Sequence, residues 1–344
     1  MPPRVLQSRE PQGMSESIKS FLVVGVLFPL HILLGICSVP VWLYLIWEGS
    51  MWARALFICY LPFYLWPAAT RFPGWKGMDA MWRYFDYSAT CADYFGRFEV
   101  RASAPIDPSA QYFVGCHPHG TLIFQRTFWR SSLLDPIFPS ARLRMLGASI
   151  LFRIPIIREM TLWFGAVDAS KANCEALLRQ GCTVVVYPGG IDEMPLTGDG
   201  AGSAVRLRTR TGFIRLAIKS GVPVLPTFCF GELEAVSAVS PLPAGLAKWL
   251  QKHLRMSTTC FLGRWNLFLP RRVPFTLCLG APIPTRQTND AAALDAETLR
   301  VHALYKQALR DLYESHRQSC GYGGRELVFM CDQGAVTARG KKAQ

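Results

Sequence analysis

The feature that most constrains this chain is a long apolar run near its N-terminus. Residues 21–47, FLVVGVLFPLHILLGICSVPVWLYLIW, contain no Asp, Glu, Lys or Arg. A helix needs about 20 apolar residues to cross the hydrocarbon core of a bilayer, so this run is long enough. A second, shorter apolar run covers residues 56–69 and contains Pro62 and Pro67. The first run is too long for a cleaved signal peptide and lacks a small-residue cleavage site.

The two apolar runs together predict a membrane hairpin over residues 21–69 that enters and leaves on one side. Basic residues flank it at both ends: Arg4, Arg9 and Lys19 before it, and Arg71, Lys76 and Arg83 after it. Positive flanks favour the cytosolic side, so both ends are expected there. Each internal proline removes a backbone hydrogen bond. One or two transmembrane helices and a kinked, re-entrant hairpin therefore both stay open.

The hairpin divides the chain into four expected parts. Residues 1–20 form a cytosolic N-terminal segment, residues 21–69 the hairpin, residues 70–331 a folded domain, and residues 332–344 a basic C-terminal tail. The formal net charge is +13. No nucleic-acid-binding motif accompanies that charge, so we expect no nucleic-acid partner. Anionic lipid head groups and an anionic soluble substrate fit it better, and a merely soluble basic surface stays open.

The cysteines indicate a reducing environment. There are 11, an odd number, and they are scattered along the chain without a C-x-x-C pair. This distribution predicts reduced, mostly buried thiols in a cytosol-facing protein rather than a disulfide framework.

Beyond about residue 105, predicted strands and helices alternate. Strands are expected at 111–116, 182–190 and 222–232, with a further strand at LRMLGA. Helices are expected from TLIFQRTFWRSS, over ILFRIPIIREMTLWFG with a proline break, after the capping residue Ser170, from TGFIRLAIKSG, and over residues 291–318. This alternation predicts an α/β sandwich with a mostly parallel sheet. The segment SPLPAGLAKWLQKHLRM and the following FLGRWNLFLP form an apolar, basic insertion expected to lie against the membrane.

Three predicted strands end in polar residues. HPHG follows the first, YPGGIDE follows the strand at 182–190, and FGE follows the strand at 222–232. Reactive groups in open α/β sheets collect in the loops at the carboxyl ends of the strands. We therefore expect these three loops to form one site.

The HPHG loop offers candidates for a general base. An imidazole suits proton removal near neutral pH, and His117 and His119 are two of only six histidines. Pro118 restricts the turn between them, and Gly120 allows close approach of a bulky substrate. Both histidines could instead be turn residues bonded to local carbonyls. A metal pair is a further alternative, but no third ligand lies nearby in the sequence.

The second loop and the segment after it offer further candidates. Gly189 and Gly190 could supply backbone amides to a phosphate or an oxyanion. Glu193 could orient an imidazole or hold an acceptor hydroxyl, or it could be a solvated loop carboxylate. Arginines at every second position precede a predicted helix start, and either clamp phosphates or form a solvated basic face; the candidate substrate-binding residues here are Arg206, Arg208, Arg210, Gly212 and Phe213.

Nucleophilic catalysis by serine or cysteine is disfavoured. No G-x-S-x-G sequence occurs in the chain. Cys116 precedes His117 directly, and consecutive strand residues point to opposite faces, so the two do not form a nucleophile–base pair. Direct transfer, with no covalent enzyme intermediate, is the expected chemistry.

At these residues the sequence resembles the type 2 acyl-CoA:diacylglycerol acyltransferase family, which includes monoacylglycerol and wax-alcohol acyltransferases. The matching stretches occur in the family's order: DYFGRFEV, VGCHPHGTL, VVVYPGGIDEM, RTRTGFIRLAIKSGVPVLPTFCFGE, VPFTLCLGAPIPT and VHALYKQALRDLYESHRQSCGYGGRELVF. They cover most of residues 71–331, and the N-terminal hairpin matches in kind. A glycerolipid-acyltransferase-like αβ sandwich after a membrane hairpin is the implied fold.

The resemblance implies an endoplasmic-reticulum membrane enzyme, with its catalytic domain facing the cytosol, that transfers an acyl group from acyl-CoA to a lipid hydroxyl. It implies His119 as the base, Glu193 as the carboxylate that holds it, and a supporting role for His117 in the turn. Relatives with an H-x4-D arrangement have an aspartate where this chain has Leu122 or Phe124. Acyl-CoA is then a co-substrate, with neither metal nor other cofactor needed.

The acceptor is where this chain departs from the family pattern. Gly96 stands in place of a proline in the family's Y-F-P block, and Ile191 and Asp192 stand where small residues are more frequent. Diacylglycerol is the first expectation, which would make triacylglycerol, followed by monoacylglycerol and a long-chain alcohol. A non-catalytic lipid-binding scaffold is the non-enzyme alternative.

The chain end suggests where such an enzyme would reside. The last residues, KKAQ, resemble a dilysine retrieval signal for the endoplasmic reticulum, although a frayed basic tail reads the same way. Such a signal is read from the cytosol, in agreement with the hairpin topology. Lipid droplets are a second expected location, and a homo-oligomer stays open.

Overall fold

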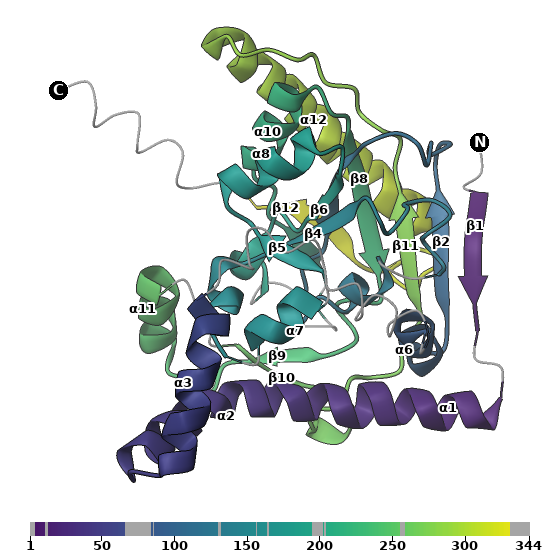
Figure 1. Ribbon diagram of the computed structural model, residues 1–344. Helices are drawn as coiled ribbons and strands as arrows, with labels where there is room; N and C mark the ends of the chain where they lie inside the picture. Colours follow the sequence, from purple (N-terminus) through teal and green to yellow (C-terminus); the bar gives the residue numbers. More distant parts are fainter. Residues whose placement is uncertain are drawn as a thin grey trace.

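The computed structural model describes residues 4–10, 13–65, 84, 86–129, 132–155, 157–163, 165–194, 202, 204–254 and 259–330. An eight-stranded mixed sheet forms its centre (Figure 1). Its strands, in spatial order, are β1 (Arg4–Arg9), β2 (Phe98–Ala102), β11 (Phe275–Leu279), β8 (Val224–Phe230), β3 (Phe113–His117), β6 (Thr183–Val186), β4 (Leu143–Gly147) and β5 (Ala166–Asp168). The predicted α/β architecture with a mostly parallel sheet is confirmed, because only the β1–β2 and β11–β8 pairs are antiparallel.

Helices cover both faces of the sheet. On one face lie α8 (Lys171–Arg179), α10 (Gly212–Ser220) and α12 (Ala291–His316), whose apolar side chains join Phe113, Val184 and Val224 in one core cluster. On the other face α6 (Tyr87–Phe95) and a short 3-10 helix, η2 (Phe124–Phe128), pack over Val114 and Cys116. The two strand faces alternate in the period-two manner of a β-strand, which allows both layers to be buried.

The remaining elements lie around this sandwich. They are the helices α1 (Met14–Ser20), α2 (Phe28–Trp47), α3 (Met51–Leu65), α7 (Ile157–Trp163) and α11 (Ala244–Leu254), a π-helix η1 (Phe21–Leu27), and the 3-10 helices η3 (Ser149–Phe152), η4 (Gly190–Asp192) and η5 (Arg264–Asn266). Two small sheets pair β9 (Ser237–Val239) with β10 (Cys260–Leu262), and β7 (Ala204–Leu207) with β12 (Glu326–Phe329).

The chain before the predicted hairpin and the chain after it meet in one sheet. Strand β1 pairs with β2, so Arg9 lies opposite Phe98. The Arg9 guanidinium also donates two hydrogen bonds of 2.8 Å to the carboxylate of Asp93 on α6. Helices α2 and α3 lie in the sequence between these two strands, and Figure 1 shows them at its lower left, away from the sheet.

A search of the described residues finds no helix that combines the length and the apolar character needed to cross a membrane. The hairpin helices nevertheless expose many large apolar side chains, among them Leu43, Trp47, Met51, Trp52 and Ile58, each more than 60 % exposed. Residues 66–83 and 331–344, with the predicted dilysine pair Lys341 and Lys342, lie outside the described residues.

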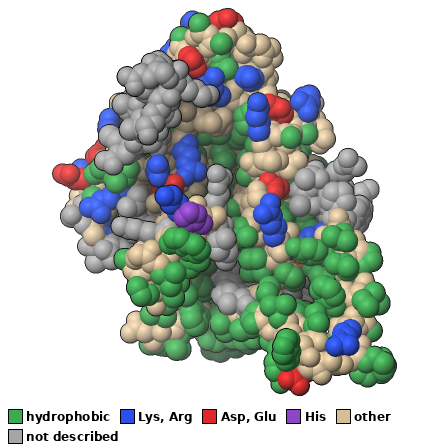
Figure 2. Space-filling model, turned by 90° about the vertical axis from the view of Figure 1, so that its left-hand side faces the viewer, with side chains coloured by type: hydrophobic (Ala, Val, Ile, Leu, Met, Phe, Trp, Pro, Cys, Tyr) green, Lys and Arg blue, Asp and Glu red, His purple; other side chains and the backbone are tan. Residues whose placement is uncertain are grey.

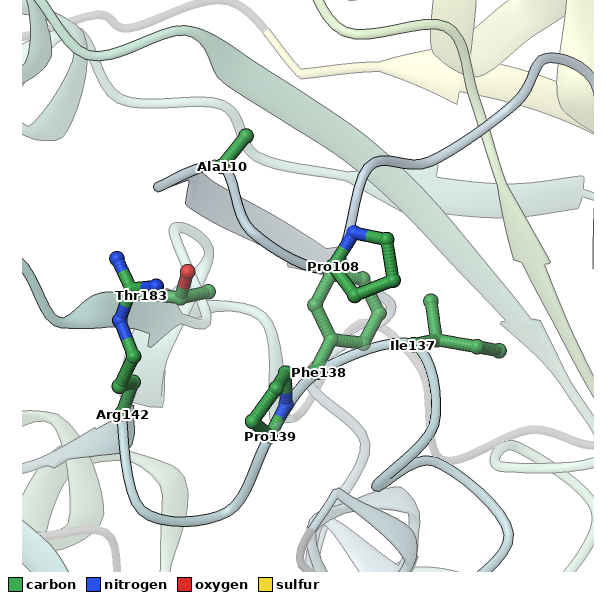
Figure 3. A pocket seen from close by; sticks show the side chains of 7 residues that line it. All are labelled: Pro108, Ala110, Ile137, Phe138, Pro139, Arg142 and Thr183. Carbon is green, nitrogen blue, oxygen red and sulfur yellow. The ribbon is translucent and has the colours of Figure 1, made fainter.

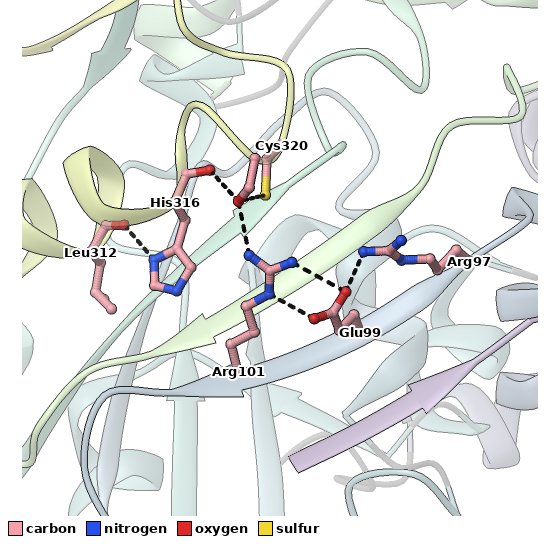
Figure 4. A network of polar contacts seen from close by, with 7 residues as sticks. Arg97, Glu99, Arg101, Leu312, His316 and Cys320 are labelled. Atoms are coloured by element: carbon pink, nitrogen blue, oxygen red, sulfur yellow. Dashed lines mark hydrogen bonds and ion pairs between the residues drawn. The ribbon is translucent and has the colours of Figure 1, made fainter. Parts of the chain in front are cut away.

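One polar network ties the sheet edge to the end of α12 (Figure 4). Glu99 on β2 is buried and accepts hydrogen bonds from Arg97 and Arg101. Arg101 also donates to Ser319 just after α12, at 2.9 Å, and His316 contacts the Leu312 carbonyl through Nδ1 at 2.8 Å. The two guanidinium groups neutralise a carboxylate that would otherwise be costly to bury.

The predicted helix from Thr121 onward is only partly present. The chain makes a turn and then the five-residue 3-10 helix η2, entered through Ile123 with a left-handed φ of 55°. The backbone N–H groups of Phe124 and Gln125 donate to the carboxylate of Glu232, each at 2.8 Å. Glu232, two residues after β8, thus caps the first N–H groups of η2, and the helix continues only to Phe128.

Candidate functional site

The three polar strand ends come together as expected. Strand β3 lies between β6 and β8 and runs parallel to both, with Gly115 opposite Val186 and His117 opposite Phe228. Their carboxyl ends therefore reach the same edge of the sheet. The loop 118–123, the loop 187–193 and the residues after Phe230 all begin at this edge.

Glu193 is the residue that joins these loops. Its side chain is fully buried. Oε2 accepts the backbone N–H of His119 at 2.7 Å, and Oε1 accepts the backbone N–H of Arg208 at 2.9 Å. Oε1 also lies 3.5 Å from Nδ1 of His117. One carboxylate thus contacts both histidines and the arginine-rich segment.

These contacts determine the charge of Glu193. Burial alone would raise its pKa, because an apolar environment disfavours a carboxylate. The His117 ring and the backbone N–H groups of Arg208 and His119 act in the opposite direction, and together they hold the pKa below its ordinary value. Glu193 is therefore ionised at neutral pH, as an acceptor of several hydrogen bonds must be.

The two histidine rings have different surroundings. His117 is fully buried, and its ring lies 6.0 Å from that of Tyr305 on α12. His119 is only partly buried, and its ring lies 6.0 Å from that of Tyr187. Strand β3 ends at His117, so the rule that residues i and i+2 share a strand face does not extend to His119.

The Glu193 carboxylate therefore contacts the two histidines in a different way from the one expected. The ring nearest to Glu193 is that of His117, whereas Glu193 reaches His119 through the backbone N–H. The expectation that Glu193 holds His119 applies to the main chain of that residue. Which histidine accepts the proton stays a prediction.

A carbonyl group determines the tautomer of His119. Nδ1 lies 2.7 Å from the carbonyl oxygen of Gly120. A carbonyl oxygen can only accept a hydrogen bond, so Nδ1 must carry the proton and Nε2 the lone pair. Burial lowers the pKa of His119, while the Gly120 contact partly opposes that effect. The geometry leaves a neutral imidazole whose Nε2 can accept a proton.

The glycines have steric functions in these loops. Gly120 has a left-handed φ of 63°, which favours glycine. At Gly189, an added Cβ would lie only 2.2 Å from the Glu193 carboxylate. The N–H of Gly190 donates to the Tyr187 carbonyl at 3.1 Å, so one of the two amides expected to face an oxyanion is already engaged.

The arginine segment surrounds an aspartate. Arg208 donates to Oδ2 of Asp192 at 2.8 Å, and Arg210 donates to the same oxygen. Gln251 on α11 donates to Oδ1 at 3.1 Å. Arg206 is exposed on β7. The segment therefore lies beside the 187–193 loop, and Asp192 was not among the sequence-based candidates.

Three residues proposed from the sequence for substrate binding have structural positions instead. Phe213 is buried in the core, with its ring 5.6 Å from that of Phe113 and 5.4 Å from that of Tyr305. Gly212 is the first residue of α10. Pro118 is buried, and its carbonyl accepts from the Gln125 side chain at 2.5 Å.

Sequence reasoning missed two groups at this edge. Glu232 is buried and holds the main chain of the turn that follows the HPHG loop, and Tyr187 has a buried hydroxyl without a hydrogen-bond partner among the described residues. Both follow predicted strands, in FGE and in YPGG, so position alone could have indicated them. A lone glutamate after a strand also resembles a solvated loop residue, so the sequence by itself does not distinguish the two.

Two further observations concern the described structure as a whole. A shallow pocket lies at the opposite, amino-terminal end of β6, where Thr183 begins the strand; its lining residues are Pro108, Ala110, Ile137, Phe138, Pro139, Arg142 and Thr183 (Figure 3). In the described part of the chain, no three His, Cys, Asp or Glu side chains gather in a way that could hold a metal ion.

Comparisons with known proteins converge on one family. The family model described as "Diacylglycerol acyltransferase" matches residues 44–329. Human acyl-CoA wax alcohol acyltransferase 2 is 29 % identical over 70 % of this chain and 74 % of its own length. Human 2-acylglycerol O-acyltransferase 3 is 28 % identical over 92 % of both chains. Diacylglycerol O-acyltransferase 2A of Umbelopsis ramanniana is 30 % identical over 82 % of this chain and 80 % of its own length.

Among solved structures, the 1-acyl-sn-glycerophosphate acyltransferase of Thermotoga maritima aligns with a TM-score of 0.37 and 15 % identity. The alignment covers 80 % of this chain and 97 % of that one.

Proposed function

Because the chain belongs to the diacylglycerol acyltransferase family, we propose that it esterifies diacylglycerol with the acyl group of acyl-CoA to form triacylglycerol. Because its relatives are acyltransferases of this family, the chain is an acyl-CoA-dependent O-acyltransferase. The names of these relatives cover three acceptors: a wax alcohol, a 2-acylglycerol and a diacylglycerol. The last of these is the acceptor proposed here.

The observation that carries the mechanism is the contact between His119 and Gly120. With the proton held on Nδ1, the Nε2 lone pair accepts the proton of the acceptor hydroxyl while the oxygen attacks the thioester carbonyl. The new C–O bond forms as the C–S bond breaks, and the imidazolium returns the proton to the departing coenzyme A thiolate. General-base assistance of this kind accelerates a reaction by roughly 10²- to 10⁴-fold.

The other residues bind or position the substrates. Glu193 holds the main chain of His119, and the buried His117 ring packs between that carboxylate and Tyr305. In this proposal His117 positions the loop without touching substrate. Arg206, Arg208 and Arg210 bind the phosphates of coenzyme A, for which guanidinium groups are well suited. Neither a metal nor a cofactor beyond acyl-CoA takes part in these steps.

The membrane hairpin is part of the same proposal. Because β1 and β2 are neighbours in one sheet, both ends of the hairpin lie on the same side of any membrane that it enters. Figure 2 shows hydrophobic side chains gathered over the lower part of one face, with Lys and Arg side chains above them. The exposed Leu246 and Trp249 of α11, and Trp265 and Leu267 after β10, extend the apolar surface.

Such a surface fits an endoplasmic-reticulum or lipid-droplet membrane, with the catalytic domain on the cytosolic side. Tryptophan is favoured at the level of the lipid head groups, and basic side chains above it attract anionic lipids. In this orientation the hydrophobic acceptor reaches His119 from the bilayer while acyl-CoA arrives from the cytosol.

The test is acyl transfer by membranes that contain the full-length protein. Labelled acyl-CoA is offered with diacylglycerol, monoacylglycerol or a long-chain alcohol in separate reactions. The proposal expects the highest kcat/KM with diacylglycerol, and a loss of turnover in His119→Ala at equal protein content. A higher kcat/KM with another acceptor changes the acceptor assignment. No turnover with any acceptor favours the lipid-binding scaffold.

His117→Ala separates the two histidines in the same assay. Its expected effect is smaller than that of His119→Ala, because the buried ring positions the loop. If His119→Ala keeps most of its activity and His117→Ala does not, the base is His117.

A further inference from the structure

A second buried carboxyl group lies beside the HPHG loop. It belongs to Glu232, two residues after the end of β8. Its residue is 1 % exposed. Oε1 accepts the backbone N–H of Phe124 and Oε2 that of Gln125, each at 2.8 Å. Each oxygen thus accepts the N–H of one of two adjacent residues in a turn, and that turn follows the HPHG loop directly.

Glu232 also contacts the HPHG loop itself, at Gly120. A Cβ added to Gly120 would lie 2.7 Å from both Cγ and Oε1 of Glu232. The carbonyl of the same glycine is 2.7 Å from Nδ1 of His119. Gly120 therefore has the Glu232 side chain on one side, and on the other it determines which nitrogen of His119 carries the proton.

Gln125 closes the loop back onto the strand. While its backbone N–H donates to Glu232, its Nε2 donates to the carbonyl of Pro118 at 2.5 Å. Its Oε1 accepts from the thiol of Cys116 at 3.1 Å. The segment 118–125 is thereby held at both ends by buried groups, and the end at Phe124 and Gln125 depends on Glu232.

We propose that Glu232 is a positioning residue for acyl transfer, which holds segment 118–125 so that the Gly120 carbonyl keeps the proton of His119 on Nδ1. This inference rests on the proposed role of His119 as the base. Glu193 and Glu232 then share the task, because Glu193 holds the N–H of His119 and Glu232 supports the carbonyl that faces its ring.

The charge environment of Glu232 is compatible with this role. Burial raises its pKa to about 8, while the N–H groups of Gln125 and Phe124 act in the opposite direction. Glu232→Gln keeps the size and shape of the side chain and changes its hydrogen bonding. A glutamine offers one acceptor oxygen where the glutamate has two, and its amide nitrogen would face a backbone N–H.

The experiment uses the full-length enzyme in membranes, with Glu232→Ala, Glu232→Gln and a control, Glu234→Gln. Glu234 lies two residues further on, and its carboxylate pairs with Arg325 and Tyr322, away from the loop. In Glu232→Ala two buried N–H groups lose their acceptor, and we expect kcat to fall by about 100-fold, the effect of a small misplacement. We expect a loss of about tenfold in Glu232→Gln.

A pH profile separates positioning from a loss of folded protein. The Gly120 contact raises the pKa of His119, which also faces Glu193, His117, Arg126 and Tyr187. If Glu232 supports that contact, the acid limb of kcat moves to lower pH in Glu232→Ala, and it stays in place in Glu234→Gln. A lower kcat with an unmoved limb would overturn the proposal.

A double variant tests the contact directly. In Gly120→Ala the added Cβ meets Glu232, so activity falls. In Gly120→Ala/Glu232→Ala that obstacle is gone, so we expect the combined loss of activity to be smaller than the product of the two single losses. A combined loss equal to that product or larger contradicts the contact. Retained activity in His119→Ala would instead contradict the assigned base, which keeps the two failures distinguishable.

Discussion

Glu193 holds His119 by its backbone N–H, at 2.7 Å, while the ring of His119 donates to the carbonyl of the next residue. The carboxylate therefore positions the proposed base, His119, without facing its ring. Catalytic dyads more often place the carboxylate against the imidazole itself. Here the Nδ1 proton is held by a backbone carbonyl, which carries no charge that could strengthen the base.

This relationship predicts the effect of Glu193→Gln. The variant keeps one acceptor and sets an amide nitrogen against the N–H of either His119 or Arg208. A buried donor without an acceptor costs about 1–3 kcal/mol, so the free energy of unfolding and kcat should both decrease. Thermal unfolding and initial rates of acyl transfer measure the two effects. Glu175→Gln is the control, because Glu175 pairs with Lys171 at the surface of α8.

The pKa of His119 predicts how activity depends on pH. Burial holds that pKa below 6.5, its ordinary value. A general base acts while it is neutral, so the midpoint of the acid limb of kcat should lie below pH 6.5. Protonation of this histidine also begins at a higher pH in the unfolded chain. Its contribution to stability should therefore be lost as the pH falls through the same range. An acid limb of kcat centred above 6.5 would contradict this assignment.

The arginine segment predicts a defect in donor binding. Arg210→Gln should raise the KM for acyl-CoA by about tenfold, because a hydrogen bond between charged groups contributes about 1.5–3 kcal/mol and Arg210 is 47 % exposed. Arg215→Gln is a matched control on α10, since Arg215 pairs with Asp295 instead. An unchanged KM in Arg210→Gln, or an equal rise in both variants, would exclude Arg210 from phosphate binding.

Asp192 predicts the opposite effect at the same place. Its carboxylate occupies Arg208 and Arg210, so it competes with an incoming phosphate for both guanidinium groups. Asp192→Asn should therefore lower the KM for acyl-CoA and strengthen inhibition by free coenzyme A. A higher KM would show that Asp192 orients the arginines for the donor.

The exposed hairpin predicts the requirements for membrane attachment. Leu43 on α2 and Ile58 on α3 are 64 % and 66 % exposed, so lysine at either position leaves the packing of the domain intact. A lysine deep in a bilayer costs about 2.5–3.5 kcal/mol, and the double variant should be released from membranes by alkaline extraction. Leu299→Lys on α12 is the control, because this leucine is 70 % exposed outside the hairpin. If the unaltered protein, the double variant and Leu299→Lys are all retained equally on membranes, the hairpin does not enter the membrane.

The parts of the fold that sequence analysis predicted are those with local signals. The β-branched run 183–186 is a strand, Ser170 caps α8 by accepting the N–H of Asn173, and α12 ends within two residues of its predicted end. Strand β1 was not predicted, because its partner, β2, lies nearly 90 residues away in the sequence. The helix expected after Thr121 is present only as the short 3-10 helix η2, whose first two N–H groups are held by Glu232, more than 100 residues further along the chain.

The sequence by itself determined the chemistry of this protein, because residue types and their order along strands are local properties. It placed two histidines, three glycines and a glutamate at predicted strand ends that meet, and three arginines just before a predicted helix. Only the tertiary structure decided which atoms meet. The choice between the ring and the backbone of His119 as the partner of Glu193, and the contact of Glu232 with Gly120, depend on how strands distant in the chain pack side by side.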